Sequence, residues 1–188
     1  KLKQSGNLLL SILNNVLDMA RIESGKMEID ESYGQIKEIQ QTLLEIFDDE
    51  AKKKNIAFHY TVNVEHEHVL IDITKVKEIF ANILSNAIKY TPKGSTITIS
   101  AKIKSDKIEV SIADNGQGIS NEAKDKLFEM FYTANSTVAD SRRGIGIGLS
   151  LCKSIIMAHG GEIKVRDNKP QGTVFIFTLP KEEINFNE

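Results

Sequence analysis

Three polar side chains recur on one predicted helix at a spacing that places them on a single face. Asn82, Asn86 and Lys89 stand at positions i, i+4 and i+7, beside an apolar row that recurs every three or four residues. Asn inside a helix costs some helix propensity because its amide competes with backbone hydrogen bonds, so a solvated stripe would more often carry Glu or Lys. An Asn amide oxygen suits Mg²⁺, and a lysine ammonium suits a phosphate oxygen. The stripe therefore indicates either a solvated surface or a site for a metal-bound phosphate.

Two glycine-rich segments further along the chain give a second reason to expect phosphate chemistry. Residues 114–119 follow a predicted strand and read Asp-Asn-Gly-Gln-Gly-Ile, a composition that an ordinary turn also favours. Residues 144–149 read Gly-Ile-Gly-Ile-Gly-Leu and directly precede a predicted helix. Glycines before a helix let backbone N–H groups approach a phosphate closely. The GxGxGL spacing, without a βαβ unit around it, argues against a dinucleotide site of the Rossmann type.

Helices and strands of a mixed chain must position these segments. An amphipathic helix that ends at Thr91-Pro92-Lys93-Gly94 is predicted from the apolar row Val76, Ile79, Phe80, Ile83, Leu84 and Ala87. Further helices are predicted over 1–25, 36–54, 121–128 and 149–158, and short strands around Met27 and Ile29, over 56–60 and over 69–71. Two antiparallel hairpins should pair 97–103 with 108–112 and 162–166 with 173–179. The polar, aperiodic stretch 133–143 predicts a loop.

The first predicted helix carries more apolar surface than one isolated helix can bury. Its seam has the spacing of a bundle or coiled coil, through Leu2, Leu9, Leu13, Val16 and Ala20. We expect this helix to complete a bundle with a helix absent from this chain or with a second subunit, and the alternative is packing on the chain's own core. Because the chain begins at Lys1 rather than Met, we expect a piece of a longer protein, with membrane attachment upstream left open.

Composition narrows the function classes. The 188 residues are 40% hydrophobic, enough for one core and an appendage. A net charge of -2 and a pI near 6.1 argue against a nucleic-acid partner. The single cysteine, Cys152, excludes a disulfide framework and predicts a buried thiol, and the histidines lack zinc-ligand spacing. No apolar run is long enough for a transmembrane helix or a signal peptide.

Taken in order, these motifs resemble the ATP-binding boxes of the GHKL superfamily, and within it the catalytic domain of bacterial sensor histidine kinases. Residues 82–90 are similar to the N box, 114–118 to the first G box, 128–131 to the F box, 144–149 to the second G box and Gly172-Thr173 to the last. The boxes follow one another in the family's order. The N-terminal helix, which ends Leu-Asp-Met-Ala-Arg-Ile-Glu-Ser-Gly-Lys, resembles the second helix of that family's dimerisation hairpin. The segment Asp140-Ser-Arg-Arg143 and the later Asp-Asn-x-Pro-x-Gly resemble the potassium-sensing branch.

The resemblance implies the Bergerat fold, an α/β (α+β) two-layer sandwich in which helices back a mixed, mostly antiparallel sheet, preceded here by a long N-terminal helix. It divides the chain into the second hairpin helix at 1–25, a catalytic ATP-binding domain at 26–182 and a tail at 183–188. It also implies ATP and Mg²⁺ as cofactors. The implied partners are the receiver domain of a response regulator, the phosphoacceptor hairpin of the same or the partner subunit, and a second copy in a homodimer. The domain would be cytoplasmic, in a protein anchored in the bacterial cell membrane.

The family's site residues carry over onto the matching positions of this sequence. Asp114 should accept a hydrogen bond from the adenine amino group, which selects ATP over GTP because guanine presents a carbonyl there. Asn86 should bind Mg²⁺, and Lys89 should neutralise phosphate charge. Asn82 and Lys89 are the residues expected to act in catalysis, and the lid at 133–143 would close over the nucleotide. Further nucleotide contacts are expected from Asn82, Tyr90, Gly116, Gly118, Ile119, Phe131, Arg142, Arg143, Gly144, Gly146, Gly148, Leu149 and Thr173.

Three features depart from the family pattern. In hydrolysing members a Glu one turn before the magnesium Asn activates water, but here that residue is Asn82. An amide cannot take the proton, so transfer to another nucleophile is expected over hydrolysis, with Glu78 as a minor alternative base. No histidine fits the phosphoacceptor setting, so the acceptor should lie outside this chain, and Thr133 replaces a common Arg. The competing interpretations are an ATP-hydrolysing GHKL clamp and a degenerate, non-enzymatic binding module.

Overall fold

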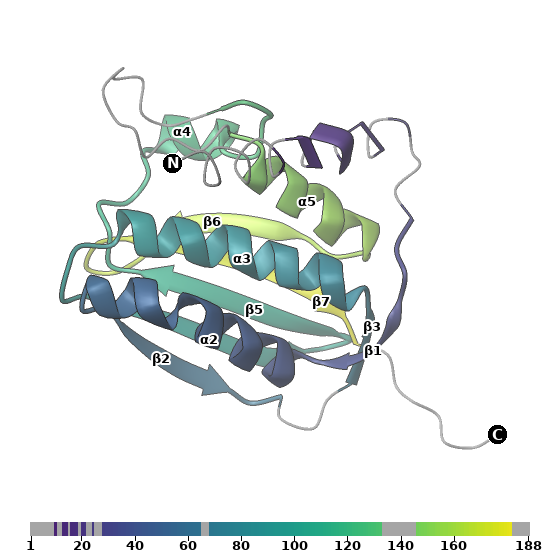
Figure 1. The fold of residues 1–188 in the computed structure, drawn as a ribbon, viewed down its shortest axis with the longest axis horizontal. Coiled ribbons are helices and arrows are strands. Elements are labelled where there is room, and N and C mark those ends of the chain that lie inside the picture. The colour runs from purple at the N-terminus through teal and green to yellow at the C-terminus, as the bar shows by residue number, and fades with distance from the viewer. Residues whose placement is uncertain are drawn as a thin grey trace.

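A five-stranded mixed sheet forms the framework of the fold (Figure 1). The computed structural model describes residues 28–64, 68–132 and 146–181, together with residues 10, 13, 14, 16–18, 20, 21 and 24. β2 runs parallel to β4, and the other neighbouring strands of the sheet are antiparallel. This arrangement confirms the predicted mixed, mostly antiparallel sheet. In spatial order, the strands are β2 (Ala57–Val62), β4 (Thr96–Lys104), β5 (Lys107–Asp114), β7 (Thr173–Pro180) and β6 (Ile163–Asp167).

Three helices lie across one face of this sheet, as Figure 1 shows. They are α2 (Ile36–Lys53), α3 (Ile73–Tyr90) and α5 (Gly148–Ala158). The pleat of β5 explains the packing, because Ile108, Val110 and Ile112 are buried in the shared core while the residues between them are half-buried. Phe80 of α3 meets Phe177 of β7 edge-on, with ring centroids 5.3 Å apart. The predicted two-layer sandwich is therefore confirmed.

A second, two-stranded sheet corrects one prediction. β1 (Ser32–Gln35) pairs antiparallel with β3 (His68–Ile71), with Tyr33 opposite Leu70. The strand predicted around Met27 and Ile29 was wrong: Ile29 lies outside regular structure, and Met27 lies outside the described residues. The physical reason is that a strand forms where a partner strand is available, and the partner β3 reaches only Ser32.

The described part of the N-terminal segment contacts α3. Its residues at 10, 13, 14, 16–18, 20 and 21 are helical, in agreement with that part of the predicted helix. The Asp18 carboxylate lies 3.1 Å from Lys75 Nζ, which also lies 3.5 Å from the Glu78 carboxylate. Burial raises the pKa of Glu78, and the neighbouring Lys75 partly offsets this effect. This network of charges joins the N-terminal helix to α3, whereas the domain limits at 25 and 182 stay predictions.

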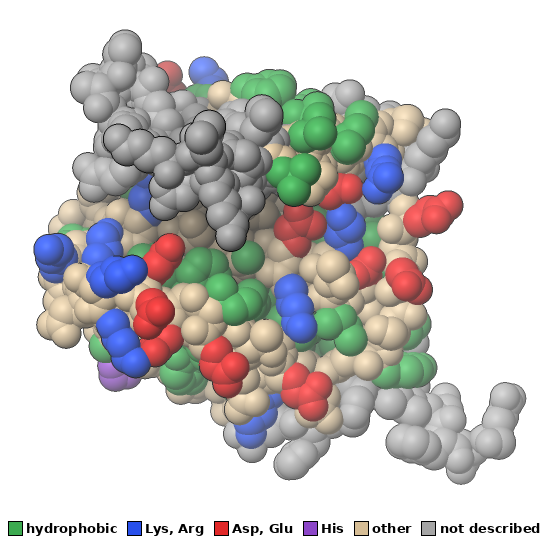
Figure 2. Space-filling view, viewed as in Figure 1, with side chains coloured by type: hydrophobic (Ala, Val, Ile, Leu, Met, Phe, Trp, Pro, Cys, Tyr) green, Lys and Arg blue, Asp and Glu red, His purple; other side chains and the backbone are tan. Residues whose placement is uncertain are grey.

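The surface of the helical layer mixes side-chain types. Figure 2 shows acidic and basic side chains interspersed with hydrophobic ones on this face. Among the exposed hydrophobic residues are Ile46 of α2 and Met157 of α5. Within the described part of the chain, no helix combines the length and apolar character that crossing a bilayer would require.

Candidate functional site

Helix α3 carries the polar stripe that the sequence predicts. The Asp72 side chain caps its first turn by accepting a hydrogen bond from Lys75 N at 3.0 Å. Asn82, Asn86 and Lys89 are half-buried rather than solvated. Half-burial of polar groups favours a binding site over a plain surface stripe, because buried polar groups require partners. The opposite face of the helix packs on the core through Val76, Ile79, Phe80, Ile83, Leu84, Ala87 and Ile88.

Helix α5 begins against Asn82 through a glycine. A Cβ on Gly148 would lie 2.8 Å from Asn82 Oδ1, closer than such atoms normally approach. The thiol of Cys152, one turn into α5, lies 3.8 Å from the carbonyl oxygen of Ile79 in α3. Burial raises the pKa of that thiol well above its usual range, so it stays protonated, and the predicted buried thiol is confirmed. The second glycine segment and the polar helix are therefore in direct contact.

Asp114 ends β5 with its carboxylate held by the backbone. Its Oδ1 accepts hydrogen bonds from Gly116 N at 2.8 Å and from Thr173 N at 3.2 Å. The residue is 6% exposed. Burial raises the pKa of Asp114, and the two N–H donors counteract part of that rise. With Oδ1 fixed by the chain, the orientation of the carboxylate is set, and Oδ2 can accept a hydrogen bond from a ligand.

The last glycine turn closes over the backbone of Asp114. Gly172 has φ +122°, and a Cβ there would lie 1.9 Å from the Asp114 carbonyl oxygen. The Asn168 side-chain amide donates to the same oxygen at 2.8 Å. On the other side, a Cβ on Gly116 would lie 2.9 Å from the Tyr90 carbonyl oxygen. The end of α3, the first glycine segment and the β6–β7 turn therefore meet around one carboxylate.

Phe131 pairs with the second glycine segment. Its backbone N–H donates to the Gly146 carbonyl at 2.9 Å, and both residues have positive φ, 61° and 75°. A Cβ on Gly146 would lie 2.7 Å from the backbone of Phe131 and Tyr132. The Phe131 side chain is 63% exposed, so its backbone rather than its ring is integrated into the fold. The F box and the second G box thus form one backbone-paired unit.

The end of α3 presents a cation and an aromatic ring. Lys89 Nζ lies 4.9 Å from the centroid of the Tyr90 ring, and Tyr90 is 47% exposed. The next residue, Thr91, is buried, and its Oγ1 has no hydrogen-bond partner within the described part of the chain. A buried hydroxyl without a partner is costly and is commonly completed by water or a ligand. Lys89 and Tyr90, which are accessible, suit contact with a polar ligand that has a flat ring.

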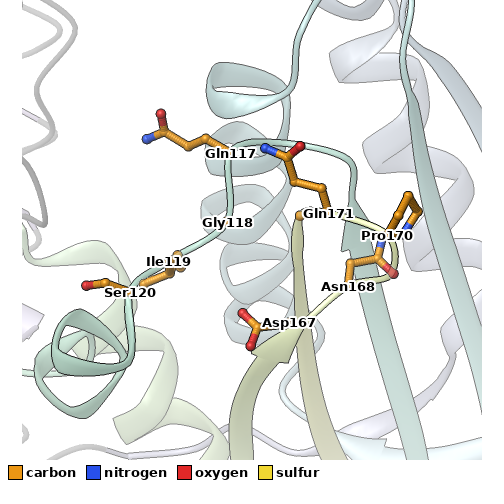
Figure 3. A pocket seen from close by; sticks show the side chains of 9 residues that line it. Gln117, Gly118, Ile119, Ser120, Asp167, Asn168, Pro170 and Gln171 are labelled. Atoms are coloured by element: carbon orange, nitrogen blue, oxygen red, sulfur yellow. The ribbon is translucent and has the colours of Figure 1, made fainter.

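A cavity borders the first glycine segment on its outer side. It has a volume of about 360 Å³ and lies between residues 117–120 and the turn at 167–172, as Figure 3 shows. Gly118 and Ile119, two of the predicted contact residues, form part of its wall. Asp167 at its edge pairs with Lys124 of α4 (Asn121–Lys126) at 2.6 Å. The cavity therefore adjoins the site without including Asp114 or α3.

The structure places most of the predicted site residues and leaves some outside the described ranges. Leu149 is half-buried against the core, and Thr173 is buried beside Asp114. Sequence reasoning missed Asn168, although the turn chemistry of Asn-x-Pro-x-Gly could have indicated it. Glu78, the alternative base, is engaged by Lys75 at 3.5 Å. Outside the described residues lie Thr133, Arg142, Arg143 and Gly144.

The residues present fit an adenine nucleotide with a bound cation. A buried carboxylate oriented by two N–H groups can accept a hydrogen bond from an exocyclic amino group. The side chain of Asn86, half-buried on the same helix as Lys89, offers an amide oxygen for a hard cation. Lys89 supplies positive charge for phosphates, and α5 begins beside Asn82, where helix N–H groups favour anions. The arrangement therefore suits binding and positioning of a nucleotide triphosphate.

Three comparisons with known proteins agree with this chemistry. The sensor protein KdpD of Clostridium acetobutylicum is 34% identical over 176 residues, which cover 93% of this chain and 19% of KdpD. The chain thus spans a small part of that relative, and the match agrees only loosely with the resemblance to the potassium-sensing branch. The crystal structure of full-length ShkA in complex with AMPPNP is 27% identical with a TM-score of 0.84, over 96% of this chain and 37% of that chain.

Two solved structures of the histidine kinase ThkA are also similar to this chain. Its complex with the response regulator protein TrrA is 28% identical with a TM-score of 0.72, over 97% of this chain and 52% of that one. The catalytic domain of ThkA alone is 32% identical with a TM-score of 0.72, over 82% of this chain and 97% of that domain. Residues 71–183 match the family of histidine kinase-, DNA gyrase B-, and HSP90-like ATPases. With the carboxylate, the polar helix and the glycine turns in the expected places, the chain belongs to this ATPase family and, within it, to the histidine kinase catalytic domains.

Proposed function

We propose that this chain binds Mg·ATP and transfers its γ-phosphoryl group to a histidine that a separate helix supplies, as part of a sensor histidine kinase. The observation that carries the proposal is the Asp114 carboxylate, buried and oriented by Gly116 N and Thr173 N where three ATP-binding boxes meet. Oδ2 of this carboxylate would accept the adenine amino group. Guanine presents a carbonyl at that position, so two acceptors would face each other and GTP would bind more weakly.

The other residues have separate positioning roles. Asn86 would supply an amide oxygen to Mg²⁺, and Lys89 would neutralise phosphate charge. Tyr90 would pack its ring near the nucleotide. Mg²⁺ held by Asn86 would supply positive charge that offsets the negative charge of the phosphates. Further contacts proposed from the boxes are Gly116, Gly118, Ile119, Phe131, Gly146, Gly148, Leu149 and Thr173, with Arg142, Arg143 and Gly144 outside the described residues.

Asn82 favours transfer to a protein nucleophile over hydrolysis. Asn82 is half-buried, and its amide oxygen lies close to Gly148. An amide cannot accept a proton from water, and the nearest carboxylate along the helix, Glu78, already faces Lys75 at 3.5 Å. Water at this site would therefore lack a general base. Catalysis would come from positioning and charge neutralisation.

The proposed partners follow from the reaction. The histidine acceptor would lie on the dimerisation hairpin of the same or the partner subunit in a homodimer, and the phosphoryl group would pass on to an aspartate of a receiver domain. The similar protein ThkA has been solved in complex with the response regulator protein TrrA, which supports a partner of that kind. We propose that the domain works in the cytoplasm, in a protein anchored in the bacterial cell membrane.

Calorimetric titration with non-hydrolysable ATP and GTP analogues, with and without Mg²⁺, tests the proposal. We expect binding that is selective for adenine and strengthened by Mg²⁺, followed by phosphoryl transfer from ATP to a separately supplied histidine-containing hairpin. Asn86→Ala should abolish the Mg²⁺-dependent part of binding, whereas Ser85→Ala, an exposed neighbour on the same helix, should bind like the wild type. Binding of neither analogue would favour a non-enzymatic module. Steady ATP turnover without an acceptor would favour a hydrolysing clamp.

A further inference from the structure

Lys54 makes three contacts with the C-terminal end of α3. It follows the last residue of α2, and its backbone N–H donates to the Ala51 carbonyl at 3.1 Å. Its Nζ lies 2.6 Å from the carbonyl oxygen of Ile88, 2.9 Å from that of Lys89 and 3.1 Å from that of Thr91. An ammonium has three N–H donors, and here three carbonyl oxygens lie within hydrogen-bonding distance. A side chain from one helix end therefore caps another helix.

The carbonyls concerned are ones that a helix end leaves without a donor. The last four C=O groups of a helix lack intrahelical partners, and the helix dipole favours a cation beside them. In α3 the Ala87 carbonyl accepts a hydrogen bond from Thr91 N at 3.0 Å. Lys54 Nζ donates to the next two carbonyls, those of Ile88 and Lys89. The Lys54 carbonyl also accepts from Gly94 N at 3.0 Å, in the turn that follows the helix. Lys54 thus holds both the last turn of α3 and the chain that leaves it.

This end of α3 carries two of the proposed nucleotide contacts, Lys89 and Tyr90. The Lys89 ammonium stacks on the Tyr90 ring, and the Tyr90 carbonyl abuts Gly116 of the first G box. A shift of the last helical turn would therefore move the phosphate-binding cation, the aromatic ring and the adenine-binding turn together. We propose that Lys54 is a positioning residue for the nucleotide, acting through the end of α3 without touching the ligand. The proposal rests on the proposed nucleotide-binding function.

Substitution of Lys54 by Met removes the three donors and keeps the aliphatic stem. We expect about a tenfold loss of affinity for a non-hydrolysable Mg·ATP analogue, because coupling between a ligand and a group that shapes its site from outside typically changes affinity by about fivefold or more. Lys52→Met is the matched control, since Lys52 is exposed and pairs with Asp48 within α2; it should change affinity less than about twofold. Lys54→Arg keeps a cation with several donors and should recover part of the loss.

Two further measurements distinguish positioning from a general effect on the fold. In Lys54→Met, amide hydrogen exchange should accelerate over the last turn of α3, while the amides of β5 keep their wild-type protection. In a Lys89→Met background, the Lys54 substitution should cost less affinity than in the wild type, because one of the groups that it positions is already absent.

The outcomes separate the two proposals. If the wild type binds the analogue and Lys54→Met binds as tightly as Lys52→Met, the positioning role is refuted while the proposed function stands. Faster exchange throughout the sheet, or full additivity with Lys89→Met, would also refute it, because Lys54 would then act on the fold as a whole. Failure of the wild type to bind the analogue would refute the proposed function itself and this inference with it.

Discussion

Replacing Asp114 by Asn should separate nucleotide recognition from fold stability. The Oδ1 atom accepts from Gly116 N and Thr173 N, and an Asn side chain must place its own oxygen there to keep both bonds. Its NH₂ group then occupies the position of Oδ2, where the adenine amino group would approach. Two donors would face each other. Rotating the amide by half a turn would restore an acceptor for adenine but leave two buried N–H groups facing an NH₂ group.

The expected magnitude follows from the bond that is lost. A hydrogen bond to a charged group is worth about 1.5–3 kcal/mol, and each 1.4 kcal/mol or so is a factor of ten in affinity. Asp114→Asn should therefore weaken an ATP analogue by roughly tenfold to a hundredfold. A GTP analogue should lose much less, since the guanine carbonyl can accept from the new NH₂ group. The ATP-to-GTP selectivity measured by calorimetry should fall accordingly.

Stability should respond in the opposite direction. Burial raises the pKa of Asp114 above its unfolded value, so the charged form is disfavoured in the fold. The wild type therefore loses stability as the pH rises from the ordinary Asp value of about 3.9 through the raised folded pKa. Asn stays neutral, so at pH 7 the variant should be as stable as the wild type or more stable. The difference in unfolding free energy should shrink on acidification.

Urea unfolding at several pH values, beside the titrations, tests this argument. Asp106→Asn is the matched control: it removes the same charge from an exposed residue in the turn at the far end of β5. It should leave affinity unchanged. The reasoning fails if Asp114→Asn binds the ATP analogue like the wild type. It fails equally if the variant is markedly destabilised at pH 7, because the main role of the carboxylate would then be to stabilise the fold.

Three other substitutions test separate contacts. Gly148→Ala places a Cβ 2.8 Å from Asn82 Oδ1 and should weaken nucleotide binding in calorimetry, and an unchanged affinity would contradict the close packing. Lys75→Met removes the cation 3.1 Å from Asp18 and should speed hydrogen exchange in the described N-terminal helix with unchanged nucleotide affinity. Phe177→Ala empties a fully buried position and should cost about 3–5 kcal/mol in urea unfolding. A cost below about 1 kcal/mol would mean that the core collapses around the gap.

Local periodicity explains which elements could be predicted. The apolar spacing of α2 and α3 and the alternation on both sides of Ser105-Asp106 are set by residues close in sequence, and the predicted helices and hairpin are confirmed. Thr91-Pro92 ends α3 at Tyr90 as predicted. Because these signals need no information from distant segments, the sequence is sufficient for them.

Pairing between distant strands could not be predicted in the same way. The parallel pairing of β2 with β4 and the antiparallel pairing of β1 with β3 join segments far apart along the chain. Ile29 lies in an alternating stretch, but no strand lies beside it among the described residues, and the pattern alone gave the wrong position for the first strand. An alternating pattern indicates that one face of a strand is buried, but it does not identify the strand that pairs with it.

For the site too, the sequence predicts which residues take part but not the contacts between segments that lie far apart along the chain. The boxes predict which residues contact a nucleotide, whereas the capping of α3 by Lys54 joins residues 34 to 37 positions apart. Lysine at the end of a helix is ordinary, and nothing in its neighbourhood along the chain indicates three carbonyl contacts. Such a role depends on how α2 and α3 pack, which only the structure gives.

The glycines of the boxes show why the site assembles from separate segments. From the sequence, Gly144, Gly146 and Gly148 were expected to contact the nucleotide, and in the structure Gly146 and Gly148 also lie close to other segments of the chain. At four glycines a Cβ would come closer than 3.0 Å to another box or to a segment beside it: Gly116 to Tyr90, Gly146 to Phe131, Gly148 to Asn82 and Gly172 to Asp114. The absence of a side chain therefore lets one box lie directly on the next. A substitution at these positions should disturb the assembled site before any ligand is added, and Gly148→Ala should show faster hydrogen exchange at the start of α5 in the ligand-free protein.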